Sequence, residues 1–238
     1  MPDHIVKSYD EQLRRLRDTL MRIGGNVETA LADAVGALGR RDAATAAAIV
    51  QRDAEVDALY RSVEEQAVKL LALRQPMAND LRLIVGAIRM ALDLERVGDY
   101  ASNIAKRAIV LSQLPPVVSV GPIQRMSRLV QEMLKDTLDA FASGDVAKAR
   151  DVWQRDEQVD EAYNAVFRNL LTYMMEDPRN ITPCAHLLFV AKNIERIGDH
   201  ATNVAETIRF IVLGEDVEGE RPKSDDSPFV IVEPPAGA

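Results

Sequence analysis

The stretch ERVGDYASNIA, from Glu95 to Ala105, returns one hundred residues later as ERIGDHATNVA, from Glu195 to Ala205. Two segments this similar indicate an internal repeat, in which one structural unit is built twice. Each copy also sets two carboxylates four residues apart, which places them on one face of a helix. The repeat therefore indicates both how the chain is divided into structural units and which residues are candidates for a functional site.

Apolar residues step by three and four through most of the chain, as they do in helices packed in a bundle. One apolar seam runs from Leu13 to Ala34, a second from Ile49 to Leu70 and a third from Leu94 to Leu111. All three recur, the first two after 103 residues and the third after 100. We predict an all-α fold of two tandem, antiparallel three-helix bundles related by a pseudo-twofold axis.

The same pattern divides the chain into four parts. Residues 1–113 form the first bundle, residues 114–121 a proline-rich linker, and residues 122–213 the second bundle. Residues 214–238 carry seven acids against Arg221 and Lys223, show no periodicity, and are predicted to be disordered.

Glycine, aspartate and proline punctuate the predicted helices. A glycine that ends one helix and an aspartate that caps the next are expected between the first two helices of each copy. These pairs are Gly39 with Asp42, and Gly144 with Asp145. Pro76 and Pro183 are predicted to lie in the first turns of the third helices.

Composition excludes several classes of protein. The formal net charge is −8 and no basic patch is evident, so nucleic acid is not an expected partner. The single cysteine, Cys184, cannot form an intramolecular disulfide, and the start of the chain is polar, which together predict a reduced, cytoplasmic setting. No apolar stretch approaches the ~18 residues that span a bilayer, so membrane association is expected only through partners.

A second repeated acid pair lies on the second helix of each copy. Asp53 and Asp57 recur as Asp156 and Asp160. Asp53 falls in the apolar register of its helix, and Asp156 does the same in the second copy. An acid on a buried seam is costly unless its charge is compensated.

The acids of the second and third helices are expected to face one another and form one oxygen-rich pocket per bundle, suited to hard or borderline metal ions. Gly98 and Gly198, which are poor helix formers, would let a backbone or ligand come close. The candidate metal ligands are Asp53, Asp57, Glu95, Asp99 and Asn103 in the first copy, and Asp156, Asp160, Glu195, Asp199 and Asn203 in the second.

Structural ion pairing is the alternative interpretation of the same acids. Four arginines adjoin them, and helices routinely carry ion pairs at these spacings. The four are Arg52, Arg96, Arg155 and Arg196. The residues alone leave metal binding and ion pairing open.

Three common functional motifs, for a di-iron centre, a phosphate-binding loop and a serine hydrolase, are missing from the sequence. None of the three histidines lies three residues after a glutamate, as a ferritin-like di-iron centre requires. There is neither a Walker phosphate loop nor a Gly-x-Ser-x-Gly elbow. We therefore expect a protein that is not an enzyme.

These residues resemble the PhoU family of phosphate-uptake regulators. The resemblance rests on the two Glu-Arg-Val/Ile-Gly-Asp segments, the paired acids of the second helices, and Arg74-Gln75-Pro76 followed by Asp80-Leu81-Arg82. It covers about residues 5–213, so the acidic tail is outside it.

The resemblance implies a cytosolic negative regulator of phosphate uptake and of the phosphate-starvation response. Such proteins act on the ATPase subunit of the high-affinity phosphate transporter and on the phosphate-sensing histidine kinase, and they commonly form homodimers. Some members bind iron or other metals in multinuclear clusters at the acid motifs. The alternatives are a carboxylate-based metal-binding or metal-storage protein and a purely structural helical scaffold.

Overall fold

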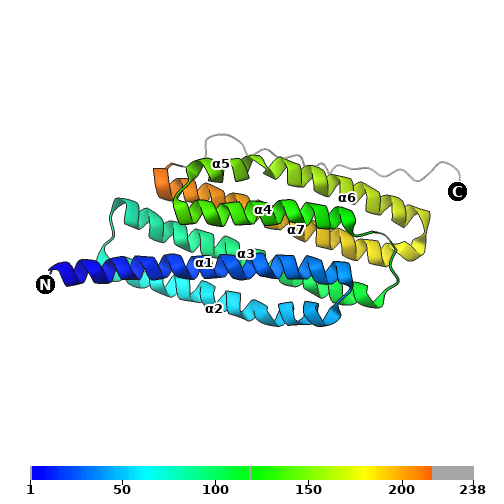
Figure 1. Cartoon of the computed structure of the whole chain (residues 1–238), viewed down its shortest axis with the longest axis horizontal. Helices are drawn as coiled ribbons and strands as arrows, with labels where there is room; N and C mark the ends of the chain where they lie inside the picture. Colours follow the sequence, from blue (N-terminus) through cyan, green and yellow to red (C-terminus); the bar gives the residue numbers. More distant parts are fainter. Residues whose placement is uncertain (1, 118, 216–238) are drawn as a thin grey trace.

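The computed structural model describes residues 2–117 and 119–215, and within them the chain is almost entirely helical (Figure 1). The first repeat consists of α1 (Pro2–Arg40), α2 (Ala43–Arg74) and α3 (Ala78–Gln113). The second consists of α4 (Gly121–Ser143), α5 (Val146–Gln154), α6 (Asp156–Glu176), a short 3-10 helix η1 (Pro178–Asn180) and α7 (Ile181–Leu213). The predicted all-α fold of tandem three-helix bundles is confirmed. The acidic tail from residue 216 onward lies outside the described residues.

The apolar seams are the buried faces of these helices. Leu16, Ile23 and Val27 of α1 are fully buried, as is Val63 of α2. Cys184 of α7 is also fully buried and not disulfide-bonded. Burial therefore explains the three-and-four spacing on which the prediction of helices rested.

Two aspartates cap helices as the sequence indicates. The Asp42 carboxylate accepts the Thr45 backbone N–H at 3.0 Å, and the Asp145 carboxylate accepts that of Lys148 at 3.0 Å. Gly144 ends α4 at a φ of 70°, a left-handed conformation that favours glycine.

Two other residues that were predicted to mark helix ends lie elsewhere in the structure. Gly39 lies within the last turn of α1 and does not end it, because the helix continues to Arg40. Pro183 lies in the first turn of α7, but the prediction for Pro76 was wrong. Pro76 lies before Met77, the residue that precedes α3, and therefore belongs to the loop.

The second helix of the second repeat is broken where that of the first is continuous. Arg155 separates α5 from α6, and its backbone N–H bonds to the carbonyls of Asp151 and Val152. Asp156 thereby becomes the first residue of α6. The amino end of a helix carries a partial positive charge, so the break gives this buried carboxylate a favourable backbone environment.

The two repeats share one core. The most extensive helix–helix contact in the described chain is between α3 and α7, and α1 also contacts α4. The four central helices are thus flanked by α2 on one side and by α5 and α6 on the other (Figure 1). No helix in the described part is long and apolar enough to cross a membrane.

The centre of the α3–α7 contact joins equivalent positions of the two repeats. Tyr100 and His200 pack with ring centroids 5.6 Å apart, as expected close to an approximate twofold axis. His200 Nδ1 lies 2.7 Å from an Asp93 carboxylate oxygen, which also accepts the Asn203 amide at 3.2 Å. His200 is therefore a packing residue of the repeat interface.

Close approach of α3 to α7 depends on Gly86. A Cβ at this position would lie 2.4 Å from Ile211 Cγ1. We expect Gly86→Ala to lower the free energy of unfolding by about 1–3 kcal/mol, because the helices must separate or Ile211 must leave its rotamer. Urea unfolding monitored by circular dichroism measures the change.

Gly25 of α1 is the matched control, since no atom lies within 4 Å of its Cβ position. Gly25→Ala is expected to stabilise the protein by up to about 1 kcal/mol through helix propensity alone. Equal effects of the two substitutions would contradict the role assigned to Gly86.

Candidate functional site

Four carboxylates gather where α2 packs on α3. Burial raises the pKa of Glu95, and the negative charges of Asp99, Asp57 and Asp53 raise it further, while Arg96 lowers it. Burial likewise raises the pKa of Asp53, with added contributions from Asp99 and Asp57. These mutual effects show that the structure brings the four predicted acids of the first repeat into one electrostatic cluster.

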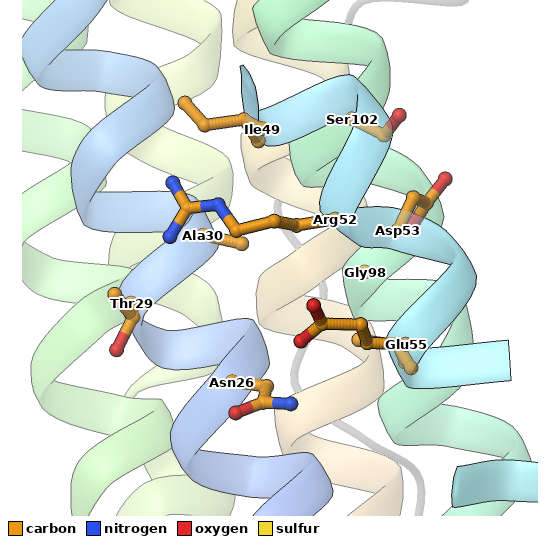
Figure 2. A pocket seen from close by; sticks show the side chains of 10 residues that line it. Asn26, Thr29, Ala30, Ile49, Arg52, Asp53, Glu55, Gly98 and Ser102 are labelled. Carbon is orange, nitrogen blue, oxygen red and sulfur yellow. The ribbon is translucent and has the colours of Figure 1, made fainter. Parts of the chain in front are cut away.

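A cavity of about 110 Å³ adjoins this cluster between α1, α2 and α3. Asp53 and Ser102 lie side by side at one edge of it, and Asn26 and Thr29 line the opposite wall (Figure 2). Gly98 lets α2 come close, because a Cβ there would lie 3.3 Å from Val56 Cγ1. The close neighbours of Gly98 are side chains, so its predicted role in admitting a backbone or a ligand stays a prediction.

The second repeat buries its acids more deeply. Asp156, Asp160 and Glu195 are 2%, 4% and 6% exposed. Burial raises the pKa of Glu195, as do Asp199 and Asp160, whereas a 2.8 Å contact with the Lys192 ammonium lowers it. The Asp156 carboxylate accepts a hydrogen bond from the Thr202 hydroxyl at 3.3 Å.

The second repeat has a larger side chain at one position that lines the cavity of the first. Ala30 lines the cavity, and the equivalent residue 103 positions later is Met133, which is fully buried. Gly198 still allows a close helix contact, with Val159 Cγ1 3.3 Å from its Cβ position. The two acid clusters are therefore related in sequence but differ in access, and the first is the more open.

The four arginines beside the acids have different partners, and the guanidinium carbon of Arg196 lies 5.7 Å from the Tyr100 ring centroid. Arg96 pairs with Asp99 at 3.1 Å and with Glu95 at 3.5 Å, so structural ion pairing is real on α3. Arg52 instead points towards α1 (Figure 2). There it pairs with Asp33 at 3.1 Å. Its equivalent, Arg155, pairs with Asp136 of α4 in the same way, and with Asp151 at 3.1 Å.

The two predicted amide ligands have other partners. The side-chain carbonyl of Asn103 accepts a hydrogen bond from the Lys106 ammonium at 3.4 Å. The Asn203 amide donates to Asp93 across the repeat interface. That contact could not be anticipated from the sequence, because Asp93 belongs to the other repeat and has Asn193 as its equivalent.

The acid clusters contain carboxylate groups of the kind that bind metal ions, but the carboxylates are not placed close enough together to form a metal site. Carboxylate oxygens suit hard cations. The repulsion between the negative carboxylates in each cluster favours the binding of a cation. Among the described residues, however, no group of three or more His, Cys, Asp or Glu side chains is placed so as to hold a metal ion. A cation would have to draw these carboxylates closer together.

The raised pKa of Glu195 predicts a pH-dependent stability. When the pKa is higher in the folded state, the native protein holds the proton more tightly, so ionisation destabilises the fold as the pH rises above the ordinary glutamate range, about 4.3. In metal-free protein we expect Glu195→Gln to raise the thermal midpoint at pH 7 by roughly 2–4 °C, and less towards pH 4.

Glu132→Gln, on the exposed face of α4, is the control and is expected to leave the midpoint within about 1 °C at both pH values. A midpoint of the Glu195 variant at or below that of the unsubstituted protein at pH 7 would contradict the destabilising role of this carboxylate.

Comparison with known sequences matches both repeats to one domain. A profile of the PhoU domain matches residues 20–108 and again residues 123–208. The chain is 52% identical over 226 residues to the phosphate-specific transport system accessory protein PhoU homolog of Caulobacter vibrioides, covering 94% of this chain and 98% of that protein. It is 49% identical to the homolog of Rhizobium meliloti, covering 93% and 94%.

Solved structures agree with the sequences. The crystal structure of PhoU from Pseudomonas aeruginosa superposes with a TM-score of 0.83 at 40% identity, covering 87% of this chain and all of that one. The phosphate transport system regulatory protein PhoU from Streptococcus pneumoniae gives a TM-score of 0.80 at 29% identity, covering 88% and 99%.

Proposed function

Because this chain belongs to the PhoU family, we propose that it is an accessory protein of a phosphate-specific transport system and restrains phosphate uptake and the phosphate-starvation response. The observation that carries the proposal is the match of both repeats to the PhoU domain, together with the transport-system role named for relatives that span nearly the whole chain.

The proposed role is regulatory and not catalytic. The chain acts in the cytoplasm as a homodimer, and it binds the ATPase subunit of the phosphate transporter and the phosphate-sensing histidine kinase. Apolar side chains at the corner between α2 and α3 support binding to proteins, since Leu73 and Met77 are 74% and 80% exposed and Leu81 is also exposed. Association with the membrane then follows only from these partners.

Deletion of the gene tests the regulatory role. In high phosphate, alkaline phosphatase activity is expected to rise at least about tenfold, and the intact gene supplied in trans is expected to restore repression. Phosphatase that stays repressed in the deletion strain would overturn the proposal. Pull-down of the tagged chain from cells in high and low phosphate identifies the partners.

Metal binding at the carboxylate clusters is a second candidate function. It is favoured by the four acids of the first cluster, which supply negative charge, and by the adjacent cavity, which supplies space for a positive ion. Iron or another divalent metal would be held by Asp53, Asp57, Glu95 and Asp99 in the first repeat. Binding would bring these side chains together and relieve their repulsion.

Titration with metal ions distinguishes metal binding by these acids from a purely structural role in ion pairs. Isothermal titration of the metal-free protein with Fe²⁺ under anaerobic conditions, and with Mn²⁺, is expected to show saturable uptake that Asp53→Ala with Glu95→Ala abolishes in the first repeat. Asp33→Ala with Glu55→Ala is the control for lost negative charge near the cavity. The absence of uptake, or equal losses in both double variants, would dispose of the metal assignment.

A further inference from the structure

A groove of about 440 Å³ lies along the seam between α1 and α2, away from the acid clusters. Its volume is in the range of sites for small molecules, roughly 300–1,000 Å³. Residues of one face of α1 form one wall, at positions 12, 15, 19 and 22, and α2 forms the other with Gln66, Lys69 and Leu70.

The charge of this groove is opposite to that of the chain. Arg15, Arg22 and Lys69 line it, against the single acid Asp18, while the whole chain has a net charge of −8. Among the side chains that the structure describes, in residues 8–117 and 119–215, none of these three cations forms an ion pair, and all three are exposed. Three cations that converge on one concavity without counter-ions favour an anionic ligand.

The polar groups beneath the cations are held in place by the protein. The Gln66 amide donates to the Thr19 hydroxyl at 3.2 Å and to the Ser62 hydroxyl at 3.1 Å. The Gln12 carbonyl accepts from Arg74 at 3.0 Å, which fixes the amino-terminal half of α1 against the end of α2. The floor is therefore ordered before a ligand arrives, which reduces the entropy lost on binding.

The groove is not a by-product of the repeated fold. The first two helices recur after 103 residues, and α4 begins at Gly121, the equivalent of Asp18, so the wall formed by Gln12 and Arg15 has no counterpart there. Lys69 is replaced by Thr172 at the equivalent position. Arg22 recurs as Arg125, so the second bundle keeps one of the three groove cations and has no basic equivalent of Arg15 or Lys69.

We propose that the α1–α2 groove binds a small, multiply charged phosphoryl anion, with Arg15, Arg22 and Lys69 contacting the phosphoryl oxygens. The guanidinium groups supply paired donors that match phosphoryl geometry, and the ammonium supplies a point charge. This inference goes beyond the proposed regulatory function and does not depend on it. Free pyrophosphate and a nucleoside diphosphate share the required chemistry.

Isothermal titration of the full chain with pyrophosphate and with ADP, at ~50 and ~150 mM salt, tests the site. Saturable binding is expected, weaker at the higher salt. Tighter binding of ADP than of pyrophosphate identifies the nucleotide as the ligand class, and the reverse order identifies the inorganic anion. Arg15→Gln with Arg22→Gln, and separately Lys69→Gln, are expected to weaken binding about tenfold or more.

Arg14→Gln with Arg17→Gln is the matched control, because these exposed arginines lie on the same stretch of α1 outside the groove. It removes the same charge and is expected to change affinity by less than about threefold, whereas Asp18→Asn is expected to tighten binding. Circular dichroism checks that each variant folds.

Three outcomes would overturn the proposal. They are the absence of saturable binding of either anion, equal losses in the groove and control variants, and binding to phosphatidylglycerol vesicles but not to either small anion. The last outcome would assign the basic face of α1 to a membrane surface.

Discussion

Close contact between α3 and α7 is the constraint on which the rest of this structure depends. These helices carry the repeated Glu-Arg-Val/Ile-Gly-Asp segments, and their contact places Tyr100 against His200 and Asp93 against His200 and Asn203. Gly86 permits the approach. Because the inner faces of both helices are committed to this shared core, their acids lie to the side, where α2 and α6 cover them.

The duplicated acid motif is consequently used in two different environments. In the first repeat, Ala30 lines a cavity beside half-buried Asp53. In the second, the equivalent of Ala30 is the buried Met133, and Asp156 is almost fully buried. The break at Arg155 gives Asp156 a helix amino end, which compensates part of the cost of its burial. One sequence motif has thus produced an accessible cluster and an enclosed one, which are expected to differ in what they admit.

The spacing of apolar residues was sufficient to predict the helices because the residues at this spacing are the buried ones, as Leu16 and Val63 show. The clustering of Glu95 with the three aspartates of the first repeat followed from the same register. What joins the repeats could not be predicted, since the contact of Asp93 with Asn203 links residues 110 apart that share no pattern. The break at Arg155 was missed because neither glycine nor proline marks it, and Pro76 was misplaced because a residue preceding a helix and one in its first turn look alike in sequence.

We expect the α3–α7 contact to make the two repeats one cooperative unit. Trp153, the single tryptophan, lies in α5, so its fluorescence reports on the second repeat, while circular dichroism reports on the helices of both. Urea unfolding followed by the two signals on one sample tests the claim directly. A single transition with coincident midpoints is expected if both repeats unfold together. Two transitions, with the Trp153 signal changing at a different urea concentration from the bulk helicity, would contradict it.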